Sequence, residues 1–178
     1  MTPVPFTPSQ TIGPFFALAL PAPGEERLVH PHADGAVTLE GTVRDGAGAP
    51  VDDALVEIWQ ADPAGRYGAD GPFTGFGRCR TDGAGGYGFV TLRPGRVPVP
   101  GGGWQAPHID VSIFARGLLA RLVTRAYLPD EADAIAADPL LASLPDGACA
   151  SLVATAGAGG YRFDVHLQGE RETTFFAV

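Results

Sequence analysis

The sequence predicts an all-β protein, a single β-sandwich that follows an extended N-terminal arm. The 178 residues include 25 glycines and 17 prolines, which are too many turn-forming residues for a helical bundle. Short apolar or alternating segments recur along the chain and are separated by Gly- and Pro-rich turns, a pattern typical of sandwiches. The hydrophobic content of 45% excludes a globally disordered chain.

The predicted elements follow in order from the arm. Residues 1–36 form the arm and its lead-in, and residues 37–178 form the sandwich domain. Strands are predicted at 37–43, 54–59, 86–92, 108–114, 121–128 and 161–167. The glycine-rich segments 75–77 and 101–103 are interpreted as turns. The single predicted helix covers 130–137, where acidic side chains favour the first turn.

Charge and composition exclude several classes of protein. The formal net charge of −8 argues against a nucleic-acid partner. No apolar stretch is long enough to cross a bilayer and no signal peptide is evident, so we expect no membrane association. Two cysteines do not make a disulfide framework, which favours a reducing, cytoplasmic location.

The histidines are the candidates for metal or acid–base chemistry. In the strand 108–114 the odd-numbered apolar residues form the expected core face, so His108 and Asp110 point together to the other face. That pair suits a metal site or a hydrogen-bonded pair, and a structural histidine fits the pattern equally. We interpret His166 as solvated, and His30 and His32 as loop residues without a third ligand nearby.

Other catalytic patterns are missing from the sequence. It contains no Gly-x-Ser-x-Gly nucleophile motif, and no phosphate-binding loop lies between a strand and a helix. The residues alone therefore predict a β-sandwich with one chemically interesting face and no complete catalytic set.

Several segments together resemble the intradiol ring-cleaving dioxygenases, although 41–56 alone matches many transthyretin-like sandwiches. The segments are 7–15, 41–46, 56–62, 65–67, 106–110, 161–164 and 168–169. Family members hold a ferric ion with two tyrosines and two histidines. Tyr67 matches the first tyrosine ligand, whereas Val97 stands at the position of the second tyrosine. His108 matches the first histidine ligand, whereas Asp110 stands at the position of the second histidine. Gln105 replaces a supporting arginine.

Two of four iron ligands are therefore lost, and the resemblance implies an α-type subunit without metal. In two-chain members of the family, a separate β chain holds Fe(3+). The complex cleaves 3,4-dihydroxybenzoate between its hydroxyls with O2, giving 3-carboxy-cis,cis-muconate. On this resemblance the chain contributes pocket wall and assembly surface in a hetero-oligomer, has no catalytic residue of its own, and keeps Tyr67 and His108 as vestigial ligand positions.

The resemblance also implies which residues reach the partner's pocket. Thr11, Gly13, Pro14 and Phe15 match arm residues that line it, and Arg125 matches an arginine near the substrate carboxylate, which a guanidinium binds through two hydrogen bonds. We expect Arg125→Ala to raise the KM for substrate. The structural alternative pairs Arg125 with a nearby acid such as Glu131.

Two other functions are left open by the sequence. The first is a stand-alone dioxygenase with iron held by Tyr67, His108, Asp110 and water. The second is a non-catalytic transthyretin-like binding module.

Overall fold

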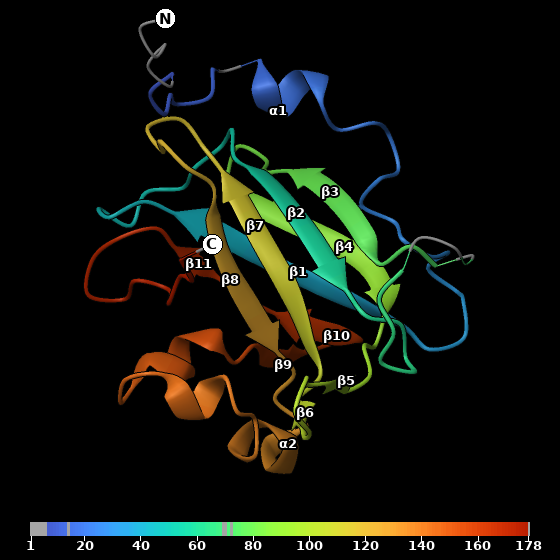
Figure 1. Ribbon diagram of the computed structural model, residues 1–178. Helices are drawn as coiled ribbons and strands as arrows, with labels where there is room; N and C mark the ends of the chain where they lie inside the picture. Colours follow the sequence, from blue (N-terminus) through green and yellow to red (C-terminus); the bar gives the residue numbers. More distant parts are fainter. Residues whose placement is uncertain (1–6, 14, 69–70, 72, 178) are drawn as a thin grey trace, which may run out of the picture.

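A computed structural model describes residues 7–13, 15–68, 71 and 73–177, which form two packed β-sheets (Figure 1). In the first sheet β1 (Ala36–Arg44) pairs on one edge with β4 (Gly86–Leu92). On its other edge β1 pairs with two short strands, β10 (Gly160–Arg162) and β11 (Val165–His166). The strand β9 (Thr155–Gly157) pairs with β10 and extends the sheet. The second sheet has the order β3 (Phe76–Arg80), β2 (Leu55–Gln60), β7 (His108–Phe114), β8 (Leu122–Tyr127). The predicted β-sandwich is confirmed.

The core lies between the two sheets and is built from their inward-facing side chains. In β7, Ile109, Val111 and Ile113 are fully buried, whereas Asp110 is only partly buried on the opposite face, as the alternation predicts. Leu39 and Phe89 of the first sheet belong to the same buried cluster.

The short elements lie at the two ends of the sandwich. A helical turn, α1 (Phe16–Ala19), lies in the arm that we expected to be extended, and a ribbon pairs β5 (Val97–Pro98) with β6 (Trp104–Gln105). The predicted helix is α2 (Ala132–Ala136), followed by the 3-10 turns η1 (Leu141–Ser143) and η2 (Ala148–Leu152). These three lie at the lower end of the molecule in Figure 1. None of the described helices has the length and apolar character needed to span a membrane.

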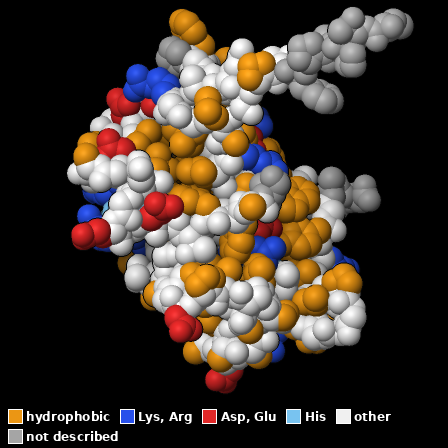
Figure 2. All heavy atoms as spheres, turned by 60° about the vertical axis from the view of Figure 1, so that its left-hand side comes forward, with side chains coloured by type: hydrophobic (Ala, Val, Ile, Leu, Met, Phe, Trp, Pro, Cys, Tyr) orange, Lys and Arg blue, Asp and Glu red, His pale blue; other side chains and the backbone are white. Residues whose placement is uncertain are grey.

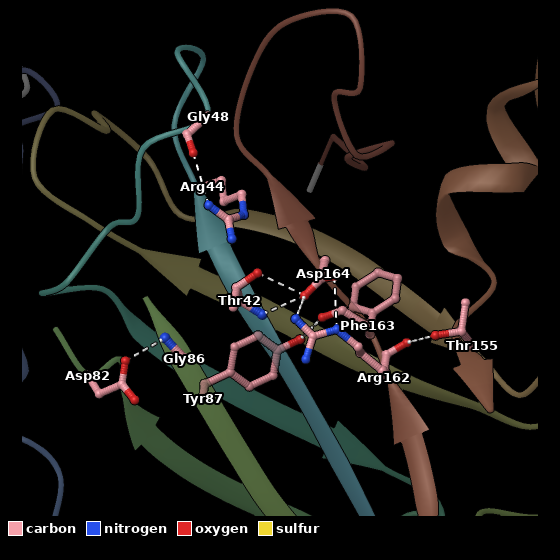
Figure 3. Close-up of polar contacts among 10 residues, drawn as sticks. All are labelled: Thr42, Arg44, Gly48, Asp82, Gly86, Tyr87, Thr155, Arg162, Phe163 and Asp164. Carbon is pink, nitrogen blue, oxygen red and sulfur yellow. Dashed lines mark hydrogen bonds and ion pairs between the residues drawn. The ribbon is translucent and has the colours of Figure 1, made fainter. Parts of the chain in front are cut away.

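Besides the helical turn in the arm, two predicted segments of the sandwich differ from the structure. Residues 161–167, expected as one strand, are divided into β10 and β11, because the carboxylate of Asp164 turns toward β1 and accepts hydrogen bonds from the backbone N and Oγ1 of Thr42, both at 2.8 Å (Figure 3). Residues 75–77 were expected as a turn, but residues 76 and 77 are the first two residues of β3, where Gly77 leaves room for the side chain of Leu28. Hydrophobic periodicity reveals neither the hydrogen bonds of Asp164 with Thr42 nor the packing of Leu28 against Gly77.

Three turns share one construction, an aspartate whose Oδ1 accepts hydrogen bonds from the backbone N–H groups two and four residues later. They begin at Asp45, Asp62 and Asp82. In the Asp62 turn, Gly65 has a φ of +77°, and a Cβ there would lie 1.9 Å from the carbonyl oxygen of Arg96. This glycine therefore lets the loop that carries Tyr67 pack against the segment before β5.

Asp164 should make the stability of the fold dependent on acid pH. Burial alone raises the pKa of its carboxyl, but hydrogen bonds from Thr42 and Arg162 outweigh burial and lower the pKa below its ordinary value. The stabilisation is thus present above the unfolded-state pKa of about 4 and is lost as pH falls through the folded-state value. Because solvent screens the partly exposed group, we expect Asp164→Asn to cost about 1 kcal/mol at pH 7. Urea unfolding from pH 7 to pH 2.5 checks this; a gap from wild type that stays constant below pH 4 contradicts it.

Candidate functional site

A polar cluster lies on the outer face of the second sheet, where β7 begins. Strand register places Asp110 opposite Arg125 of β8 and His108 opposite Tyr127. The turn at Asp62 brings Tyr67 onto the same cluster, where its ring stacks on that of Trp59 with centroids 5.9 Å apart. Residues far apart in sequence therefore meet at one end of the sheet.

His108 is held in one tautomer by the backbone. Its Nδ1 lies 2.7 Å from the carbonyl oxygen of Ala106, which can only accept, so Nδ1 carries the proton and Nε2 is an acceptor. The carboxylate of Asp138, fully buried, accepts from the backbone N of Ala106 at 2.7 Å and fixes that carbonyl. Burial and the nearby charge of Arg125 lower the pKa of His108, so the imidazole is neutral at pH 7.

Tyr67 connects the two polar groups of β7. Its Oη lies 3.2 Å from Nε2 of His108 and 3.3 Å from Oδ2 of Asp110, and its one hydrogen can be donated to either acceptor. Burial, and then the negative charge of Asp110, raise the pKa of the phenol above its ordinary value. Tyr67 is therefore a neutral hydrogen-bond donor in this structure.

Arg125 forms an ion pair with Asp110 inside the cluster. Its Nε donates to Oδ1 of Asp110 at 2.8 Å, and the two side chains are 19% and 24% exposed. The guanidinium also lies 5.9 Å from the ring centroid of Phe176. Glu131, the acid named as an alternative partner from the sequence, instead pairs with Arg93 and Arg96. The pairing with Asp110 follows from strand register, which sequence periodicity does not specify.

The arm docks at the opposite end of β7. Oγ1 of Thr11 accepts from the backbone N of Gly117 at 2.7 Å, and the ring of Phe16 packs on that of Phe114 with centroids 5.4 Å apart. Phe15 is 76% exposed, and Gly13 is also exposed. Pro14 lies outside the described residues. Thr11, Gly13 and Phe15 lie on the docked arm, whereas Arg125 lies in the polar cluster at the other end of β7. The predicted contacts of all four with a substrate pocket stay predictions.

Apolar side chains are exposed beside the docked arm. Leu18 and Leu119 are 58% and 63% exposed, and a hollow of about 210 Å³ between the arm and the β7–β8 loop is lined by residues that include Ile12 and Phe114. Figure 2 shows hydrophobic side chains gathered over the face that comes forward from the left of Figure 1. Exposed apolar area of this kind is typical of surfaces that meet another protein.

Comparison with known proteins identifies the family. The sequence profile of a family described as dioxygenase matches residues 13–169. The chain is 42% identical to the protocatechuate 3,4-dioxygenase alpha chain of Burkholderia cepacia, over the full length of both chains. It is 36% identical to the beta chain of the same organism, covering 77% of this chain and 66% of that one. This chain belongs to the intradiol dioxygenase family.

The solved dioxygenase domain of a carbohydrate-binding fusion protein from Streptomyces sp. SirexAA-E has the same fold as this intradiol dioxygenase chain. The two superpose with a TM-score of 0.62 at 28% identity, covering 92% of this chain and 98% of that domain. The fold class expected from the sequence and the resemblance to the family are both confirmed.

The iron of the intradiol family does not fit the residues at this site. Among the described residues no group of three His, Cys, Asp or Glu side chains is placed to hold a metal. The cluster offers one phenol, one imidazole and one carboxylate, and Arg125 already pairs with that carboxylate. Val97, in β5, has no donor atom, and Gln105 is its partner in β6. A ferric ion needs more anionic donors than remain here.

His30 and His32 lie close together in an exposed loop, with ring centroids 5.5 Å apart and the backbone N of His32 donating to Nδ1 of His30. His166 is partly buried in β11. In the described part of the chain, neither place provides a third His, Cys, Asp or Glu ligand. Of the four histidines, His108 is therefore the one with a polar partner from a distant segment, the phenol of Tyr67.

Proposed function

We propose that this chain is the α-type subunit of a protocatechuate 3,4-dioxygenase and works beside an iron-bearing β subunit. The complex would cleave 3,4-dihydroxybenzoate between its hydroxyls with O2 and yield 3-carboxy-cis,cis-muconate. The Fe(3+) of the β subunit supplies the oxygen chemistry. The observation that carries the proposal is the match to an α chain over the whole length. It is supported by the ion pair of Arg125 with Asp110, the residue that the resemblance places at a lost iron-ligand position.

The arm is the part of this chain that we assign to the partner's substrate pocket. Thr11, Gly13, Pro14 and Phe15 were predicted to line it, and the exposure of Phe15 leaves its ring free to pack on another chain. The hydrogen bond from Gly117 to Thr11 fixes where the arm leaves the sandwich. Positioning by a few hydrogen bonds matters in catalysis, because small displacements of pocket walls lower the rate. A cytoplasmic location belongs to the same proposal and agrees with the free thiols of Cys79 and Cys149.

The proposal is tested by purifying this chain alone and together with its β partner, and by measuring iron content, visible absorption and O2 uptake with 3,4-dihydroxybenzoate. We expect iron, colour from tyrosinate bound to ferric iron, and activity only in the paired sample. Colour and activity in this chain alone would support a stand-alone enzyme built on Tyr67, His108 and Asp110. A stable chain that does not associate with the β subunit would support the binding-module alternative.

Thr11 should position the arm over the partner's pocket. In the complex, Thr11→Val removes the oxygen that accepts from Gly117 while keeping the shape of the side chain. Because the arm is then less well fixed, we expect the KM for 3,4-dihydroxybenzoate to rise by about threefold to tenfold, which corresponds to a lost hydrogen bond. Thr11→Ser keeps the hydroxyl and should restore the wild-type KM. Equal KM values in all three proteins would remove Thr11 from this role.

A further inference from the structure

We propose that a hollow at one end of the first sheet binds a multiply charged oxyanion, a phosphate or a polycarboxylate, through the guanidinium groups of Arg44 and Arg171. The hollow lies between the turn that begins at Asp45 and the loop that follows β11, and its volume is about 310 Å³. It belongs to a different sheet from the polar cluster of β7. The inference concerns this chain alone and does not depend on its pairing with a β subunit.

Strand pairing and one hydrogen bond hold the guanidinium of Arg44 beside the hollow. Arg44 is the register partner of His166 in the parallel pair of β1 and β11, so the two side chains point to the same face of the sheet. Nη1 of Arg44 donates to the carbonyl oxygen of Gly48 at 3.0 Å (Figure 3). Gly48 and His166 both line the hollow, as does exposed Arg171 from the loop after β11. Guanidinium groups from both walls are therefore available to one ligand.

Neither of these guanidinium groups has an acidic partner among the described residues. The chain carries 20 acidic and 12 basic side chains, and most of its arginines form an ion pair with a carboxylate. Arg44 and Arg171 form none, although acids are in excess. Guanidinium groups bind carboxylates and phosphates through paired N–H groups. Two neighbouring arginines without a carboxylate thus suit an anion that comes from outside the chain.

His166 adds a third donor to the hollow. Burial and the nearby charges of Arg171 and Arg44 lower the pKa of its imidazole, against the opposite effect of Asp164. The imidazole is therefore neutral at pH 7 and still carries one ring N–H. An oxyanion can accept that N–H together with those of the two guanidinium groups.

Three acidic side chains lie near the hollow, and two of them are already engaged. Oδ1 of Asp45 accepts two backbone N–H groups of its own turn, both at 2.9 Å. Asp164 binds Thr42 and forms an ion pair with Arg162. Glu170 is exposed at the rim, where its carboxylate can turn into solvent. The hollow therefore offers more free donors than free acceptors.

The test is calorimetric titration of the full chain, co-purified with its β partner if it requires one, with pyrophosphate and separately with citrate at low ionic strength. We expect the hollow to bind one anion per chain with a Kd of about 1 mM or lower. Arg44→Gln and Arg171→Gln should each weaken binding at least about fivefold, because each removes charge-assisted hydrogen bonds. The matched control is Arg80→Gln, which removes an exposed arginine of β3 in the other sheet and should leave the Kd unchanged.

The outcomes separate the site from unspecific attraction. Binding of neither probe overturns the proposal, and so does equal affinity in wild type, Arg44→Gln and Arg171→Gln. Glu170→Gln should bind at least as tightly as wild type, and weaker binding would place the anion elsewhere. Arg171 lies in an exposed loop, so its variant decides the matter even if Arg44→Gln unfolds. Binding of pyrophosphate alone identifies a phosphate site, and binding of citrate alone identifies a polycarboxylate site; both support the proposal.

Discussion

Gly41→Ala in β1 should strongly destabilise the sandwich. A Cβ at this position would lie 1.9 Å from the carbonyl oxygen of Phe163 and 2.9 Å from Oη of Tyr87. Oη of Tyr87 donates to that carbonyl at 2.5 Å (Figure 3). The methyl group therefore forces apart β1 and the segment between β10 and β11 and breaks a buried hydrogen bond. We expect a loss of about 3 kcal/mol or more in the free energy of unfolding.

The matched control is Gly88→Ala in the neighbouring strand β4. A Cβ at Gly88 meets no atom within 4 Å, so this variant should stay within about 1 kcal/mol of wild type. Thermal unfolding followed by circular dichroism compares the two, and the expected difference is roughly 6–12 °C in Tm for a chain of this size. Similar Tm values for both variants would mean that the sheets accommodate a methyl group at Gly41.

Asp110→Asn should be the most damaging change in the polar cluster. It leaves the permanent positive charge of Arg125 without its carboxylate partner in a place where the arginine side chain is 19% exposed. Breaking a buried ion pair by removing one partner costs more than the pair itself contributes, because the remaining charge stays desolvated. We expect a loss of about 2–4 kcal/mol, measured by urea unfolding at pH 7.

Two comparisons distinguish this effect from a general loss of charge. Asp52→Asn breaks an ion pair with Arg116 in which both side chains are 60% exposed, and it should cost less than about 0.5 kcal/mol. The double variant of Asp110→Leu with Arg125→Met replaces both charges by apolar groups and should recover most of the loss. If the double variant is as unstable as Asp110→Asn, the ion pair is not the cause.

Local patterns predicted much of the sandwich. The alternation in 108–114 placed three apolar residues in the core and His108 and Asp110 on the other face, because successive side chains of a strand point to opposite sides. The same reasoning failed at 161–167, where alternation continues through Asp164 although the strand does not. The interruption is caused by hydrogen bonds from Thr42, which lies 122 residues earlier in the chain.

The sequence indicated the residues of the candidate site but not the contacts among them. Tyr67, His108 and Asp110 were singled out one by one, through strand alternation and the resemblance to the family. Their meeting, however, depends on how the turn at Asp62 packs against the sheet, and the partner of Arg125 depends on the register between β7 and β8. A shift of that register by one residue would direct Arg125 to the other face of the sheet.

The sequence by itself determined the class of fold and the polar face of β7, and its resemblance to the family implied that Val97 and Asp110 stand at two iron-ligand positions. The fold class and the polar face follow from residue types and short-range periodicity, which act within a few neighbouring residues. Only the tertiary structure decided that Arg125 neutralises Asp110 and that the arm docks on Gly117. Those contacts join distant segments, and their partners are chosen by packing and strand register, which no local pattern encodes.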